Sequence, residues 1–132
     1  ASCLVGSEMC IRDSYFAVAS VRDESVITSG AYERYFEENG KRYSHILDPK
    51  TGRPAKTDIS SVTIIDRDGA RADALCTALF AMGWDRAEAF LRSRPELKAL
   101  LMHADMEHAV MTPAAASSVT SSDPSVKLTV LK

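Results

Sequence analysis

A short segment, residues 41–54, combines an imidazole, a carboxylate and hydroxyl groups in the sequence KRYSHILDPKTGRP. Histidine has an ordinary pKa of about 6.5, so the His45 imidazole is a group that can change its charge near neutral pH. Asp48 and Gly52 are typical of a tight turn, because Asp bonds the backbone amides ahead of it and Gly adopts left-handed conformations. We therefore expect Asp48 to hold the turn. His45 would stand at a strand end, where a rigid sheet could aim it at a ligand, or it would belong to an ordinary strand-to-loop junction.

Two polar residues, Asp73 and Thr77, interrupt an otherwise apolar helical run over residues 71–83. At a separation of four residues, both side chains rise from one face of a helix. A carboxylate and a hydroxyl there could bind Mg²⁺, which takes one or two carboxylates from a protein and completes its octahedron with water and substrate phosphate. A structural alternative is that Asp favours helix N-termini and Thr returns its hydroxyl to the preceding turn. The apolar surroundings predict a buried helix.

The elements that position these residues begin with predicted strands. Residues 15–21 and 26–28 are separated by a polar turn, which predicts a hairpin whose second strand ends at Ser29 and Gly30. Gly30 would let the backbone approach a ligand closely, or would simply form a bulge or turn.

A second hairpin is predicted around Asn39-Gly40, which is the strongest short-range hairpin signal in a sequence. Its strands would be residues 32–37 and 41–46. Residues 61–65 then predict a buried strand that leads into the Asp73 helix.

After the Asp73 helix, Gly83 predicts a stop, and Asp85 and Glu88 have capping-box spacing for a second helix that runs to about Arg92. Its inner side would carry Ala89 and Phe90, with Ala87 as a further candidate. A final hairpin is predicted from residues 97–102 and 108–111, with His103 and His108 facing solvent beside its turn.

The two ends of the chain have other patterns. Residues 1–14 show neither a helical nor a strand period, and they are interpreted as a non-native leader and excluded from the fold. Residues 112–124 are rich in Ala, Ser, Thr and Pro, a composition that predicts a linker or mobile loop. Residues 126–131 predict a short closing strand.

The composition fits one domain with a core of its own. The chain has 132 residues, of which 45% are hydrophobic, and a net charge of -2, which argues against a dedicated surface for nucleic acid or for a membrane. Of the three cysteines, Cys3 and Cys10 lie in the leader, and Cys76 is expected to be a small core residue.

Three motifs together resemble the C-terminal half of the ApbE family, the FAD:protein FMN transferases. They are TSGAY at residues 28–32, HILDPKTG at residues 45–52 and ADALCTA at residues 72–78. The resemblance covers about residues 16–111. It implies an α+β fold in which an antiparallel sheet of hairpins packs against two helices, as half of a T-fold-like transferase domain, over residues 15–111. It also implies an N-terminal half that this sequence does not contain.

The resemblance implies Mg²⁺-dependent transfer of FMN from FAD to a Thr or Ser hydroxyl of an acceptor protein, with release of AMP. In this sequence Asp73 and Thr77 would hold the metal and His45 would be the catalytic base. The flavin would be bound by four residues: Ser29, Gly30, His45 and Ile46. Two alternatives remain, an FAD pyrophosphatase that uses water as the acceptor and an inactive flavin-binding fragment. The family is typically exported to the periplasm or held at the outer face of the inner membrane.

Overall fold

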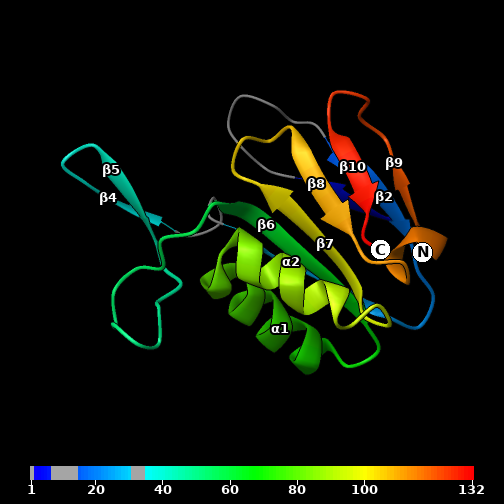
Figure 1. Ribbon diagram of the computed structural model, residues 1–132, viewed down its shortest axis with the longest axis horizontal. Coiled ribbons are helices and arrows are strands. Elements are labelled where there is room, and N and C mark those ends of the chain that lie inside the picture. Colours follow the sequence, from blue (N-terminus) through cyan, green and yellow to red (C-terminus); the bar gives the residue numbers. More distant parts are fainter. Residues whose placement is uncertain (1, 7–14, 31–34) are drawn as a thin grey trace.

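A computed structural model describes residues 2–6, 15–30 and 35–132. Two helices cover one face of a five-stranded sheet, and a three-stranded sheet covers the other face (Figure 1). The larger sheet has the order β10-β8-β7-β6-β3. Its strands are β3 Ser25–Gly30, β6 Ile59–Asp66, β7 Lys98–His103, β8 His108–Met111 and β10 Lys127–Val130. This arrangement confirms the predicted α+β class, except that β10 runs parallel to β8 where an antiparallel neighbour was expected.

The core has two halves because the central strands are buried on both faces. Along β7, Ala99 and Leu101 face the helices, whereas Leu100 and Met102 face the smaller sheet. Alternation of this kind follows from the two-residue period of a strand. Full burial of one such leucine contributes about 1.5–3 kcal/mol. The five-stranded sheet is therefore the rigid layer on which the other elements are held.

The smaller sheet consists of β1 Ser2–Gly6, β2 Tyr15–Ser20 and β9 Val119–Ser121 in the order β1-β2-β9. The predicted hairpin between β2 and β3 is wrong, because these strands belong to different sheets. β2 has β1 on one edge and β9 on the other, which leaves no edge for β3, and β3 pairs along its whole length with the longer β6. Residues 21–24 therefore carry the chain from one sheet to the other.

The first of the two terminal segments contributes a strand. Residues 2–6 form β1 and pair with β2, although their sequence shows no strand period. That residues 1–14 are a foreign leader stays a prediction, and residues 1 and 7–14 lie outside the described residues.

Residues 112–124 are not a loose linker in this structure, which corrects the prediction. They form the short 3-10 helix η1 Ala115–Ser117 and the strand β9. Thr112 is fully buried, and its Oγ1 accepts the Ala99 N–H at 3.0 Å and donates to the Leu97 carbonyl at 2.5 Å. The prediction from composition was wrong because the buried Thr112 hydroxyl forms hydrogen bonds to residues distant in sequence, which the composition of the segment cannot indicate. The predicted closing strand is confirmed as β10.

The helices are α1 Gly69–Met82 and α2 Trp84–Arg92. The Asp68 carboxylate caps α1 by accepting the N–H groups of Ala70 and Arg71, and α1 ends at Gly83, whose φ is +79°. The stop at Gly83 is thus confirmed.

The start of α2 differs from the prediction. No side chain of the helix caps it, and instead the Asp58 carboxylate accepts the Trp84 N–H at 2.8 Å. Asp85 therefore does not act in a capping box. The buried side of α2 carries Ala87 and Leu91, while Ala89, which was expected inside, is exposed.

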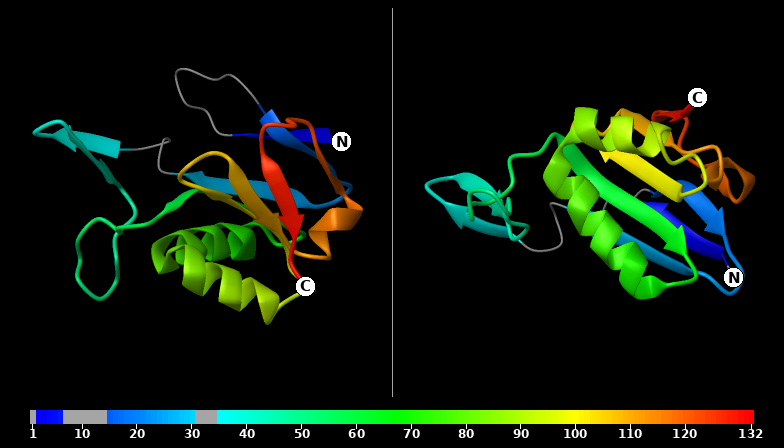
Figure 2. Two further views of the ribbon diagram at one scale, coloured as in Figure 1. Left: turned by 45° about the horizontal axis from the view of Figure 1, so that its top comes forward. Right: turned by 60° about the horizontal axis from the view of Figure 1, so that its bottom comes forward.

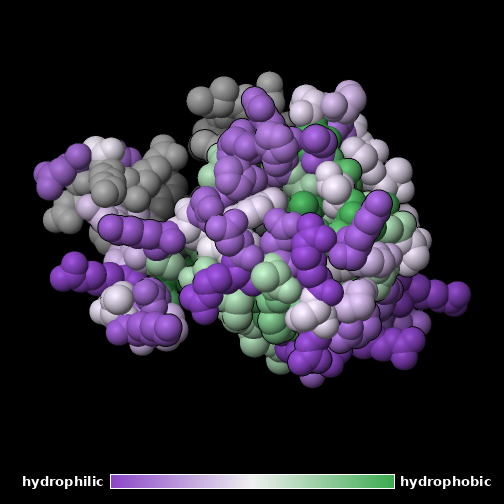
Figure 3. Space-filling model, in the orientation of Figure 1, coloured by the Kyte–Doolittle hydropathy of each residue, from purple (hydrophilic) through white to green (hydrophobic). Residues whose placement is uncertain are grey.

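The predicted Asn39-Gly40 hairpin is confirmed as β4 Tyr35–Glu38 and β5 Lys41–Ser44. Asn39 and Gly40 have φ values of +52° and +71°, as a type I′ turn requires. Residues 32–34 of the predicted strand lie outside the described residues. Figure 2 shows this hairpin and the loop after it standing apart from the layered body. The space-filling view shows a mainly hydrophilic surface there, whereas hydrophobic atoms are visible over the helices (Figure 3).

Among the described residues, none of the helices has the length and apolar character that crossing a membrane requires.

Candidate functional site

Asp73 and Thr77 are exposed and lie one turn apart on α1. Leu75, midway between them, lines a cavity beside α2 together with Phe90. Because a helix turns about 100° per residue, the side chains of Asp73 and Thr77 point away from α2. Cys76, in the same turn, donates its thiol hydrogen to the Ile27 carbonyl of β3 at 3.2 Å. The carboxylate and the hydroxyl thus stand on the outer flank of α1, over β3 at one edge of the described sheet.

The apolar run misled the prediction that α1 is buried almost all round. Only one side, formed by Ala72, Cys76, Leu79 and Phe80, is buried. Ala74 and Ala78 lie exposed beside the Asp73–Thr77 pair. Alanine favours a helix without requiring burial, so it does not distinguish a core face from a solvent face. Cys76 is a buried core residue, as expected.

Ser29 and Gly30 are the last two residues of β3, where they pair with Val62 and Ser61 of β6. Ser29 is two residues from Ile27, which packs against the helix-side core, so alternation places Ser29 on the helix side of the sheet. Gly30 is buried. The end of β3 thus presents one small hydroxyl toward the layer that carries Asp73 and Thr77.

The loop after β5 is a tight hairpin of its own. Ile46 accepts the Ala55 N–H at 2.8 Å through its carbonyl, and Asp48 donates its N–H to the Arg53 carbonyl at 2.8 Å. The Asp48 Oδ1 accepts the Lys50 N–H at 2.9 Å, and Gly52, with φ of +65°, completes the turn. These bonds give Asp48 the turn-holding role that the sequence predicts.

His45 and Ile46 differ in burial. Ile46 is buried in the helix-side core together with Ala55, so both ends of the loop are fixed against the layer that contains α1. His45, the residue before it, is exposed. Ile46 therefore anchors the loop, while the neighbouring His45 is exposed to solvent.

Four of the predicted site residues thus share the helix side of the sheet: Ser29, Ile46, Asp73 and Thr77. The structure places Ser29, the Ile46 anchor and the α1 flank on that side, whereas the other face is filled by the smaller sheet. A complete metal cluster is not formed by the described ranges 2–6, 15–30 and 35–132, which contain no group of three or more His, Cys, Asp or Glu placed to hold an ion. Asp73 and Thr77 fit Mg²⁺ as a partial set of hard oxygen ligands, which is how that ion is commonly bound in proteins.

Sequence reasoning missed Asp58, which joins three elements. Its side chain holds the start of α2, and its carbonyl accepts the Ala104 N–H of the β7–β8 turn at 2.8 Å. Asp58 thereby fixes the downstream end of the His45 loop where the chain enters β6. Its partners are distant in sequence, so no local motif marks it.

The fold is that of flavinyl transferases. The flavinyl transferase ApbE of Pseudomonas stutzeri, in its apo form, aligns with a TM-score of 0.62 and 34% identity, covering 76% of this chain and 32% of that one. The ApbE protein of Thermotoga maritima aligns with a TM-score of 0.66 and 36% identity, covering 79% and 34%.

The sequence comparisons agree, because a model of the ApbE family matches residues 5–101. The chain belongs to the ApbE family. It is 53% identical over 88 residues to the FAD:protein FMN transferase of Treponema pallidum, which covers 67% of this chain and 24% of that relative. With the FAD:protein FMN transferase of Klebsiella pneumoniae it shares 43% over 83 residues, covering 63% and 26%. The chain therefore spans about a quarter of the length of these relatives.

Proposed function

We propose that this chain supplies the C-terminal part of a site that transfers FMN from FAD to a Thr or Ser hydroxyl of an acceptor protein. The observation that carries the proposal is the position of Asp73 and Thr77 on an open flank of α1, on the side of the sheet to which Ile46 anchors the His45 loop. The names of the relatives support the reaction type. The remainder of the site would come from a part of the protein that precedes this segment in its relatives.

The chemistry explains the residue types. Breaking the pyrophosphate of FAD builds negative charge on phosphoryl oxygens and releases AMP, and a divalent cation neutralises such charge. Asp73 and Thr77 would hold Mg²⁺ through a carboxylate and a hydroxyl oxygen. His45 would take the proton from the acceptor hydroxyl, and Ser29, Gly30 and Ile46 would line the flavin side of the pocket. By family membership, we also propose a periplasmic location.

The test is protein flavinylation by the full-length enzyme that contains this chain. His45→Ala is expected to lower the rate of acceptor labelling by about 10²–10⁴-fold, the usual effect of losing a positioned base. FAD affinity should fall far less than the labelling rate, because Ser29, Gly30 and Ile46 remain to line the flavin side of the pocket. In-gel flavin fluorescence of the acceptor measures the labelling, and fluorescence titration measures the affinity.

His108→Ala is the matched control, because it removes an exposed imidazole from β8. It should label the acceptor at the normal rate. Normal labelling by His45→Ala would remove this residue from the mechanism. Accumulation of free FMN without labelled acceptor would instead favour the hydrolytic alternative, an FAD pyrophosphatase.

A further inference from the structure

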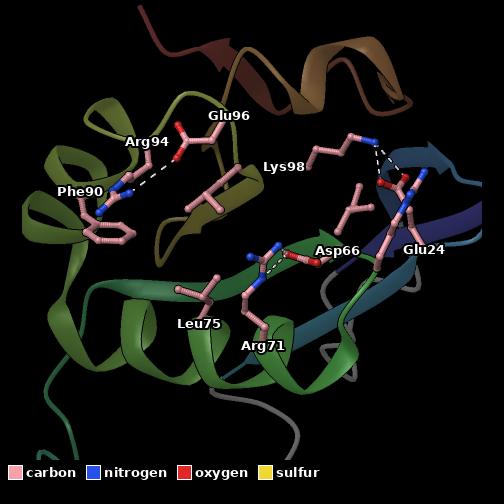
Figure 4. Close-up of a pocket in the computed structure, with 11 residues that line it drawn as sticks. Glu24, Asp66, Arg71, Leu75, Phe90, Arg94, Glu96 and Lys98 are labelled. Carbon is pink, nitrogen blue, oxygen red and sulfur yellow. Dashed lines mark hydrogen bonds and ion pairs between the residues drawn. The ribbon is translucent and has the colours of Figure 1, made fainter.

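A cavity of about 510 Å³ opens between α1 and α2, beside the end of β6 and the beginning of β7 (Figure 4). Its volume is within the range of small-molecule pockets, about 300–1,000 Å³. Leu75 lines the cavity from α1, and this residue points away from Asp73 and Thr77. The His45 loop enters the opposite end of β6. The cavity is therefore separate from the candidate flavin site.

The floor of the cavity is apolar. Leu75 of α1, Phe90 of α2 and Leu97 before β7 are half-buried and line it together with the buried Ile65. Figure 4 shows the Phe90 ring at one end of the hollow and Leu75 below it. An aromatic ring and branched aliphatic side chains form a surface on which a planar group can stack.

The rim has more positive than negative groups. Four cations, Arg67, Arg71, Arg94 and Lys98, face three carboxylates, Glu24, Asp66 and Glu96, which leaves one positive charge in excess. Burial opposes ionisation of Asp66, but hydrogen bonds from the Asp68 N–H and from Arg71 outweigh it and hold the pKa of this carboxyl below its usual value. The lowered pKa favours the charged form of Asp66 beside Arg71. By formal charge, the rim carries one more positive than negative group.

These cations differ in how strongly they are paired with the carboxylates. Lys98 bonds both oxygens of Glu24, at 2.8 and 2.9 Å, in a partly buried pair. Arg94 meets Glu96 only at 3.8 Å, with both side chains more than half exposed, and exposed pairs of that kind are weak. Arg67 has no ion-pair partner among the described residues.

Arg71 also keeps free donors. It directs Nε and Nη2 to one oxygen of Asp66, at 2.9 and 2.6 Å, which leaves Nη1 available to a ligand. Arginine is the residue that binds phosphate through paired N–H groups. The guanidinium groups of three arginines thus border the apolar floor of the cavity. Arg67 has no ion-pair partner in the described part of the chain, and Arg94 is only weakly paired.

We propose that this cavity binds a small phosphorylated ligand with a planar ring, of the nucleoside monophosphate class. The ring lies on Phe90 and Leu75. The phosphate binds Arg67 and Arg94, displacing Glu96 from Arg94, and takes the free Nη1 of Arg71. Lys98 remains paired with Glu24 and lines the cavity without contacting the phosphate. This site is independent of flavin transfer.

Calorimetric titration of the 132-residue chain tests the site with AMP as the probe. One AMP should bind per chain, and adenosine and inorganic phosphate should each bind at least about tenfold more weakly. Arg67→Gln and Arg94→Gln should each weaken AMP binding about tenfold or more, because each removes a hydrogen-bonded charge. Phe90→Leu should weaken AMP binding but leave phosphate binding unchanged.

Arg86→Gln is the matched control, since Arg86 is exposed on α2 and does not line the cavity. Equal losses in Arg86→Gln and Arg67→Gln would show general charge attraction and overturn the proposal, as would the absence of saturable AMP binding. If Asp73→Asn weakened AMP binding while Arg67→Gln did not, AMP would be reporting the proposed flavin site and not this cavity. Thermal unfolding of each variant confirms that it is folded.

Discussion

At the scale of single residues, the site depends on polar side chains that stand outside the core. Asp73 and Thr77 are exposed on a helix whose opposite side is fully buried, so neither contributes to packing in the described structure. A carboxylate that only stabilised the helix would be expected in the first turn, but the Asp68 side chain already caps α1 and the first turn contains no acidic residue. The structural alternative for this pair is thereby weakened.

We therefore predict that Asp73→Asn and Thr77→Val change metal dependence and leave stability unchanged. In the full-length protein, each should raise the Mg²⁺ concentration for half-maximal flavinylation by at least about tenfold. Loss of a residue that only hydrogen-bonds to a metal ligand already lowers metal affinity by about 10–100-fold, so loss of a ligand itself should have at least that effect. Excess Mg²⁺ should rescue Thr77→Val more than Asp73→Asn, because the carboxylate carries the charge. The measurement is the labelling rate across a Mg²⁺ titration.

Asp85→Asn gives the same change of charge on the neighbouring helix and should leave the titration unaltered. If the Asp73 and Thr77 variants followed the same Mg²⁺ curve as the unaltered protein, the pair would not bind the metal.

At the scale of elements, the junction between α1 and α2 is held from outside the helices. Gly83 separates them with a positive φ that other residues rarely adopt, and Asp58 supplies the cap that α2 lacks. Asp58 also bonds the β7–β8 turn through its carbonyl. Asp58 thus connects three parts of the structure: the end of the His45 loop, the start of α2 and the β7–β8 turn.

This arrangement predicts different costs for two aspartates. Asp58→Ala should lower the free energy of unfolding by about 1 kcal/mol, the usual cost of losing a side-chain cap. Asp85→Ala, at the position that the sequence favoured for the cap, should cost only the smaller interaction with the helix dipole, about 0.3–1 kcal/mol. Urea unfolding of the 132-residue chain measures both. A larger loss for Asp85→Ala than for Asp58→Ala would contradict the cap assignment.

At the scale of the whole molecule, the sequence predicts what is encoded locally. The Asn39-Gly40 turn, the Gly83 stop and the Asp48 turn each depend on a few neighbouring residues, and each is present in the structure. Three of the errors involve distant partners, whereas the error about the burial of α1 has a local cause, because alanine is found on core and solvent faces alike. β2 pairs with β1 and β9, Asp58 caps α2, and Thr112 fixes a segment that composition alone assigns to a linker.

In the candidate site too, the sequence predicts the local motifs but not the features that depend on residues distant in sequence. Residue types and spacing predict the Asp73–Thr77 pair and the His45 loop as candidates, because both motifs are short. The side of the sheet on which they lie could not be predicted, since it depends on burial of Ile46 and Ala55 in the helix-side core. The cavity bordered by Arg67 and Arg94 could not be predicted for the same reason, because its lining comes from three separate stretches of the chain: Glu24, residues 65–75 and residues 90–98.

The length of the chain leads to a last prediction about cooperation between its site and the rest of the protein. Asp73 and Thr77 would provide only part of the octahedron of Mg²⁺, and the segments of the relatives that match this chain make up only 24% of one relative and 26% of another. FAD should therefore bind the isolated chain weakly and with little dependence on Mg²⁺. A chimera that joins residues 2–132 to the preceding part of the Treponema pallidum relative should bind FAD at least about tenfold more tightly with Mg²⁺ than after EDTA treatment. Fluorescence titration compares the two, and Asp73→Asn in the chimera should remove the Mg²⁺ effect. Equally tight, Mg²⁺-dependent binding by the isolated chain would show instead that the described residues already form a complete site.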